Sequence, residues 1–127
     1  MNLEKVIFAF TLILAASINF GFFLGDTDNA NHHHVYGLYA AIFFNAVAVI
    51  LKFGDRSHIG AVLLASSAVA VLQLIAAAVI WGYAVYVTET GLVESVVASI
   101  VSLSGGVLLA NSFSLLLLMI EVVILRR

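Results

Sequence analysis

The chain has 127 residues, of which 64% are hydrophobic and 9% are charged, and its formal net charge at pH 7 is −2. A soluble domain carries about a quarter charged residues, and one of this length has too little interior to hide so much apolar surface. The few lysines and arginines exclude a nucleic-acid partner, and the absence of cysteine excludes disulfides and thiolate metal sites. We therefore expect an integral membrane protein.

Apolar stretches long enough to cross a bilayer as helices, for which about 20 residues are needed, occur four times. They comprise residues 6–25, 36–53, 59–87 and 93–125. Helices satisfy their own backbone hydrogen bonds inside hydrocarbon, and the short alternating segments of a membrane β-barrel do not occur. The sequence therefore predicts an all-α protein, with residues 1–127 as a single domain in which four transmembrane helices form a compact bundle.

The lysines and arginines predict the orientation of this bundle, because positively charged connections stay in the cytoplasm. With four spans, both chain ends and the connection between the second and third helices share one side of the membrane. That side holds every Lys and Arg, which are Lys5, Lys52, Arg56, Arg126 and Arg127. We therefore expect both termini to be cytoplasmic, in a multi-pass protein of the bacterial inner membrane.

The connection between the first two helices, residues 26–35, is rich in groups that can bind cations. It does not match an EF-hand, because the loop lacks the required glycine and the closing glutamate. Adjacent histidines cannot all converge on one ion, so we assign no metal site and expect no cofactor. Two interpretations stay open: either the segment caps and turns the chain, or Asp26, Asp28, His32 and His34 form an acidic outer vestibule that concentrates cations.

Each predicted helix also carries an amide side chain at membrane depth. These are Asn19, Asn45, Gln73 and Asn111, the last three near the midplane. Polar groups in hydrocarbon have to pair or to face water, so the amides either hold the helices together by hydrogen bonds or line a pathway. Glu121, the one acidic residue well inside a span, either pairs with Lys5 or Arg126 or accepts a proton or cation at the inner mouth of that pathway.

Small residues recur at every fourth position of the last helix. They are Ala98, Ser102, Gly106, Ala110 and Ser114. Small side chains let helices approach closely in lipid, so this seam either packs inside one bundle or forms the interface of a homo-oligomer. The pair Gly105-Gly106 leaves open a further alternative, in which the last helix is interrupted there.

Three segments resemble a family of small uncharacterised bacterial inner-membrane proteins with four helices. They are GDTDNANHHHVY at residues 25–36, LKFGDR at residues 51–56 and SLSGG at residues 102–106. The resemblance implies the same membrane fold but brings no known activity, and no catalytic or nucleotide-binding motif occurs, so we do not expect an enzyme.

The functional prediction is a small homo-oligomeric membrane protein that forms or contributes to a channel or transport pathway for a small cation or polar solute. The alternative is a non-transporting accessory or scaffold subunit of a membrane complex. Membrane lipids are the expected partners, and a cytoplasmic or membrane partner protein stays open.

Overall fold

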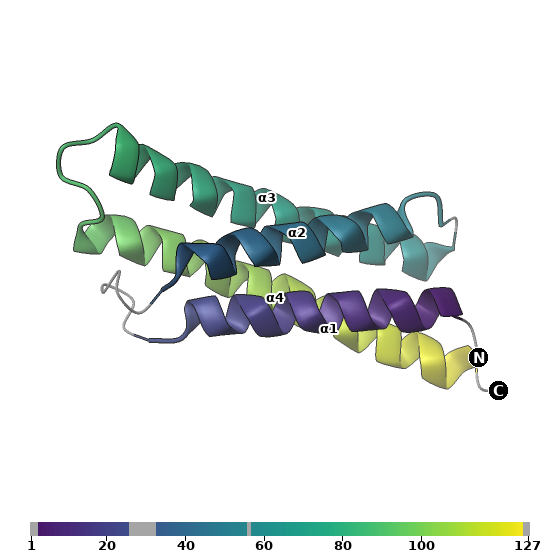
Figure 1. The fold of residues 1–127 in the computed structure, drawn as a ribbon. Helices are drawn as coiled ribbons and strands as arrows, with labels where there is room; N and C mark the ends of the chain where they lie inside the picture. The colour runs from purple at the N-terminus through teal and green to yellow at the C-terminus, as the bar shows by residue number, and fades with distance from the viewer. Residues whose placement is uncertain (1–2, 26–32, 56, 126–127) are drawn as a thin grey trace.

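The computed structural model describes residues 3–25, 33–55 and 57–125, and these residues form four helices without a strand (Figure 1). The helices are α1 (Leu3–Phe23), α2 (Val35–Lys52), α3 (His58–Tyr86) and α4 (Glu94–Leu125). The prediction of an all-helical chain is confirmed. We call the end of the bundle that holds the start of α1, the end of α4 and the α2–α3 connection the near end, and the opposite end the far end.

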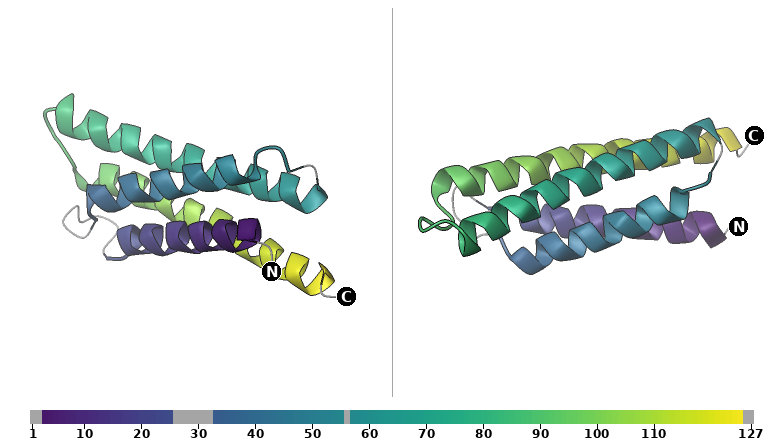
Figure 2. Two further views of the ribbon diagram at one scale, coloured as in Figure 1. Left: turned by 45° about the vertical axis from the view of Figure 1, so that its right-hand side comes forward. Right: turned by 90° about the horizontal axis from the view of Figure 1, so that it is seen from above.

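Each helix runs antiparallel to the next and packs against it, and α1 packs against α4 to close the ring. Figure 2 shows the α1–α2 pair beside the α3–α4 pair. The turn between α2 and α3 depends on Gly54, whose φ of 95° favours glycine, and on Ser57, whose hydroxyl accepts a hydrogen bond from the Gly60 backbone N–H at 2.9 Å.

The buried positions of the helices follow a spacing of alternately three and four residues. On α4 they are Val97, Ile100, Ser104, Val107, Asn111, Ser114, Leu118 and Glu121, with Val101 buried beside Ile100. On α3 they include Gly60, Leu63, Ser67, Ala70, Leu74 and Ala77. This seven-residue repeat keeps one seam of each helix facing its neighbours, as in left-handed four-helix bundles.

Helix α4 is continuous through Gly105 and Gly106, so the alternative of an interrupted last helix is wrong. Both glycines are points of close approach. A Cβ atom on Gly105 would lie 3.0 Å from the Phe23 ring, and one on Gly106 would lie 2.6 Å from the Gln73 amide nitrogen. The glycines therefore admit neighbouring side chains rather than break the helix.

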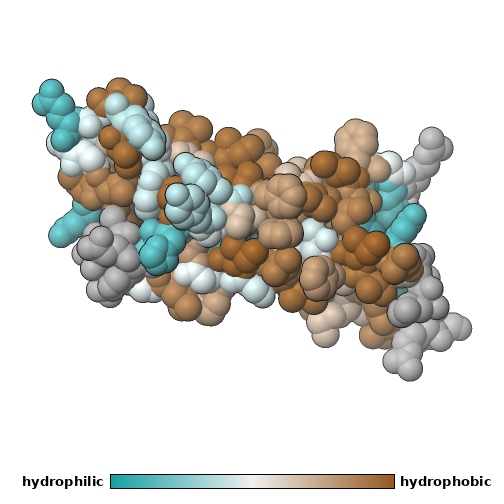
Figure 3. Space-filling view, viewed as in Figure 1, coloured by the Kyte–Doolittle hydropathy of each residue, from teal (hydrophilic) through white to brown (hydrophobic). Residues whose placement is uncertain are grey.

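The outward faces of the four helices are apolar. Phe10, Ile50, Leu72 and Leu109, one from each helix, are all at least two-thirds exposed. Figure 3 shows hydrophobic side chains along the middle of the molecule and hydrophilic ones mainly toward its ends. By length and composition, all four helices are able to cross a membrane.

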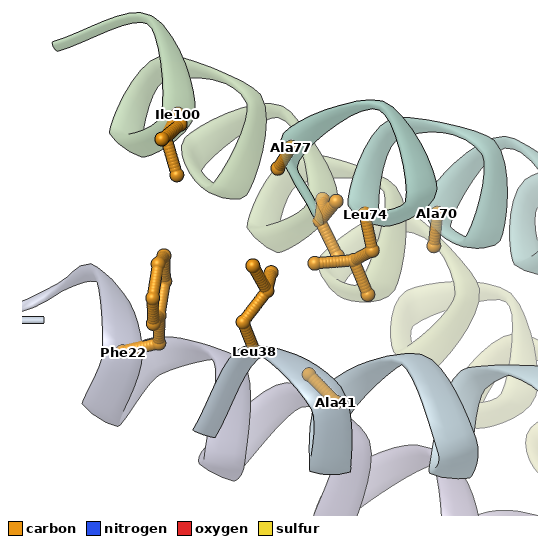
Figure 4. Packing of buried hydrophobic residues seen from close by; sticks show 8 residues of the cluster. Phe22, Leu38, Ala41, Ala70, Leu74, Ala77 and Ile100 are labelled. Atoms are coloured by element: carbon orange, nitrogen blue, oxygen red, sulfur yellow. The ribbon is translucent and has the colours of Figure 1, made fainter. Parts of the chain in front are cut away.

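Inside the bundle, the described residues form two separate clusters of buried apolar side chains. The far cluster consists of Phe22, Leu38, Ala41, Ala70, Leu74, Ala77, Ile100 and Val107 (Figure 4). The near cluster consists of Phe8, Leu12, Ala48, Leu63 and Leu118. The core is therefore divided along the bundle axis, and polar residues lie where the division falls.

Candidate functional site

Five buried polar side chains lie between the far and near clusters along α2, α3 and α4. Two of them, Ser66 and Ser114, bond to each other, and we call the other three the central layer. They are Asn45 on α2, Ser67 on α3 and Asn111 on α4, and all three side chains are completely unexposed. On the same three helices, the members of the far cluster nearest to these residues in sequence are Ala41, Ala70 and Val107. The nearest members of the near cluster are Ala48, Leu63 and Leu118. Three helices thus each present one polar residue to the same level of the bundle.

The contacts between α3 and α4 set this level. The hydroxyl groups of Ser66 and Ser114 share a hydrogen bond. In antiparallel helices that rise about 1.5 Å per residue, this contact places Ser67 and Asn111 within about one helical turn of each other along the axis. Asn45 lies at the same level, because Ala41 on one side of it packs in the far cluster and Ala48 on the other side packs in the near cluster.

The central layer has more hydrogen-bonding capacity than the described residues use. Both amide atoms of Asn111 and the hydroxyl of Ser67 find no partner among them. Asn45 donates its amide nitrogen to the Ala41 carbonyl at 2.9 Å, but its Oδ1 is also without a partner among the described residues. An unsatisfied buried polar atom costs about 1–3 kcal/mol, so such atoms usually mark the place of a water molecule or a ligand.

Asn19 lies elsewhere and is fully bonded. Its amide nitrogen donates to the Ser104 carbonyl at 2.9 Å, and the Ser104 hydroxyl donates to its Oδ1 at 2.7 Å. This reciprocal pair joins α1 to α4. Asn19 therefore acts as a hydrogen bond between helices, and its polar atoms have no comparable capacity left for a solute.

Gln73 also lies outside the central layer. It precedes the seam position Leu74, is partly buried and covers Gly106, and its Oε1 has no partner among the described residues. With Ser66, Gly106 and Ala110 it lines a groove of about 480 Å³ between α3 and α4. The midplane amides predicted from the sequence are thus divided: Asn45 and Asn111 lie at one level of the bundle, between the two clusters, and Gln73 faces the groove.

The small-residue seam follows this α3–α4 contact over part of its length. Gly106 lies under Gln73, Ala110 lines the groove, and Ser114 bonds to Ser66. Ser102 is exposed and Ala98 is half-buried. The near half of the seam therefore packs within one chain.

Charged residues gather at the near end. Glu121 pairs with Lys5 at 2.7 Å, which is one of the two interpretations that its sequence position allows. The buried Lys52 ammonium lies 3.5 Å from Asp55 and 4.4 Å from the centre of the Phe8 ring. Hydrogen bonds from the backbone N–H and hydroxyl of Ser57, together with the Lys52 charge, lower the pKa of Asp55.

Two cavities open among these charged groups. One of about 420 Å³ is lined by Lys5, Asp55, His58 and Glu121, and one of about 610 Å³ is lined by Glu4, Lys5, Lys52 and Asp55. The near cluster lies between these cavities and the central layer.

At the far end, Asp26, Asp28 and His32 lie outside the described residues, and His34 is exposed. His33 was not singled out by its sequence, yet it is buried, and its Nδ1–H donates to the Phe22 carbonyl. The described residues hold no group of His, Asp or Glu side chains arranged to bind a metal.

Ser67 is the central-layer residue that the polar pattern of the sequence did not reveal. Serine is common and inconspicuous in apolar helices. The signal that identifies it is its place in the seven-residue repeat of α3, three positions before Ala70 and four after Leu63.

Comparisons with curated proteins and with solved structures found no match to the chain. The model of one protein family matches residues 32–122, which include α2, α3 and most of α4. This match covers well over half of the chain and all three residues of the central layer. The chain therefore belongs to the family described as "Family of unknown function (DUF6394)".

Proposed function

We propose that this protein spans the membrane as a four-helix bundle and provides a transport pathway for a small polar solute. The observation that carries the proposal is Asn111, which is completely buried and has both amide atoms without a partner among the described residues. Together with Asn45 and Ser67, it gives the bundle interior a place for a guest that forms hydrogen bonds.

In this proposal, the two apolar clusters act as barriers on either side of the central layer. The far cluster separates the layer from the far end, and the near cluster separates it from the charged cavities. A solute in the layer is then occluded, and passage requires the clusters to open in turn. Because the layer lies inside one bundle, this pathway does not require a second copy, although we keep homo-oligomerisation as an expectation.

The orientation that we propose places the near end in the cytoplasm of a bacterial cell. Lys5 and Lys52 lie there, in keeping with the preference of positive residues for the cytoplasmic side. The near-end cavities then form an inner vestibule, in which Glu121 is already neutralised by Lys5.

The alternative function is that of a non-transporting accessory or scaffold subunit. The bonded pairs Asn19–Ser104 and Ser66–Ser114 favour it, because they show that buried polar groups also hold this bundle together. This alternative predicts no solute passage and gives the unpartnered atoms of Asn111 no role.

Solute permeation into vesicles separates the two functions. Purified protein in lipid vesicles is expected to accelerate osmotic re-swelling in a permeant polar solute above the rate of protein-free vesicles. Asn111→Leu replaces the amide by an apolar side chain of nearly the same size, and this variant is expected to lose the acceleration. Ser112→Leu alters the neighbouring, exposed residue and serves as the matched control, which is expected to re-swell as fast as the wild type.

The transport proposal is wrong if wild-type vesicles take up neither neutral solutes nor ions faster than protein-free vesicles. It is also wrong if Asn111→Leu and wild type transport equally well. In both cases the scaffold function becomes the better account.

A further inference from the structure

We infer that the central layer accepts an uncharged solute that both donates and accepts hydrogen bonds, of the small amide or polyol class, and excludes cations and anions. This inference rests on the proposed transport function and names its substrate class. It follows from the charges around the layer, from the chemistry of its free atoms and from their number.

Charge is the first argument. The charged side chains of the described residues lie toward the two ends of the bundle, and none belongs to the central layer or to either apolar cluster. Glu121, the carboxylate nearest to the layer along α4, is paired with Lys5. An ion in the layer would lose its hydration without gaining a counter-charge, which strongly disfavours it.

The free atoms of the layer are the second argument. Asn45 Oδ1 and Asn111 Oδ1 accept hydrogen bonds, Asn111 Nδ2 donates them, and the Ser67 hydroxyl does either. A cation is repelled by the amide N–H group, and an anion is repelled by the two amide oxygens. A neutral amide has NH₂ donors for the oxygens and a carbonyl acceptor for Asn111 Nδ2, and the hydroxyls of a polyol provide both kinds of group.

The number of oxygen atoms in the layer is the third argument against a cation. The three side chains of the layer supply one oxygen each, whereas a hard divalent cation takes six or more oxygen ligands. The backbone carbonyls of the surrounding turns are engaged in helical hydrogen bonds. A neutral solute of a few heavy atoms needs only the hydrogen bonds that the layer offers.

The test compares neutral and charged probes with the same full-length protein in vesicles of neutral phospholipid. Urea and glycerol are followed by light scattering during osmotic re-swelling, and K⁺, Na⁺ and formate are followed by ion-sensitive dyes trapped in the vesicles. We expect uptake of urea or glycerol above that of protein-free vesicles, lost in Asn111→Leu, with ion uptake at the protein-free rate.

The outcomes are distinguishable. Ion uptake that depends on Asn111, with or without uptake of neutral probes, overturns the inferred substrate class but leaves the transport function standing. No uptake of any probe overturns the transport function itself. Thermal unfolding and gel filtration of each variant in detergent establish that Asn111→Leu remains folded, so that a loss of uptake is not a loss of protein.

A second variant tests the chemistry without a change of shape. Asn111→Asp replaces the donating NH₂ group by a carboxyl group, which donates a hydrogen bond while it is protonated and only accepts once alkaline pH has ionised it. If the cargo is neutral and needs that donor, uptake of urea and glycerol by Asn111→Asp falls as the pH is raised, whereas uptake by the wild type does not. Uptake of urea or glycerol by Asn111→Asp that equals the wild-type rate at every pH, alkaline pH included, overturns the role given to Asn111 Nδ2.

Discussion

Asn19 and Asn111 are the same residue type, both completely buried in α-helices, yet their hydrogen bonding differs. Asn19 is bonded through both amide atoms to Ser104 on the neighbouring helix. Asn111 has no partner among the described residues. The polar atoms of a buried side chain stabilise the fold when they form hydrogen bonds and destabilise it when they do not, so the two asparagines should respond differently to the same substitution.

Asn19→Leu is expected to lower the free energy of unfolding by about 1–3 kcal/mol, because it leaves the Ser104 hydroxyl without its acceptor. Asn111→Leu is expected to leave stability unchanged or to raise it, because an apolar side chain of similar size replaces atoms that make no bond. Thermal unfolding of both variants in the same detergent measures the difference. Equal destabilisation by the two substitutions would contradict the assignment of Asn111 as an unpartnered group.

At the scale of elements, α4 shows how glycine functions inside a long apolar helix. Glycine within a helix costs about 1 kcal/mol relative to alanine. In α4, Gly105 allows Phe23 of α1 to lie close to the helix, and Gly106 does the same for Gln73 of α3. A small residue at position 106 therefore sets how closely α3 can approach α4 in the folded bundle.

Gly106→Leu is expected to destabilise the bundle by about 1–3 kcal/mol, because the larger side chain must displace Gln73 and separate α3 from α4. Gly21→Leu is the matched control: Gly21 is exposed on α1, and a Cβ atom there meets nothing within 4 Å. Chemical or thermal unfolding of the two variants gives the comparison. The close approach at Gly106 is unimportant if both substitutions have the same effect.

For the whole molecule, the two ends of the bundle differ in charge. The near end holds the ion pairs Lys5–Glu121 and Lys52–Asp55, which join α1 to α4 and α2 to the start of the α2–α3 turn. The connection between α3 and α4 at the far end carries Glu89 and no Lys or Arg. This asymmetry is the physical basis of the proposed orientation, because positive connections resist translocation across a membrane.

A reporter fused after Arg127 tests that orientation. We expect an enzyme that is active only in the cytoplasm to be active there, and one that is active only outside it to be inactive. A fusion placed in the α3–α4 connection, next to Glu89, should give the opposite pattern and serves as the control. Activity of the external reporter after Arg127 would show that the near end faces outward.

The sequence predicts most of the candidate site, and the differences between that prediction and the arrangement in the structure share one cause. Depth in an apolar helix identifies Asn45 and Asn111, but depth alone selects Gln73 and Asn19 as well. Gln73 has the right depth and lies one position away from the core residue Leu74, so it faces the groove between α3 and α4. Ser67 has the right position on its helix but is an inconspicuous residue type.

The sequence by itself determined four apolar helices, because backbone polar groups in hydrocarbon have to bond within their own helix. It also determined that the two described lysines, Lys5 and Lys52, lie at the same end of the bundle. Only the tertiary structure decided which buried polar groups are bonded and which are free. That outcome depends on the register of one helix against another, as the contrast between Asn19 with Ser104 and the unpartnered Asn111 shows. The periodicity of a single helix contains no information about the register of its neighbour.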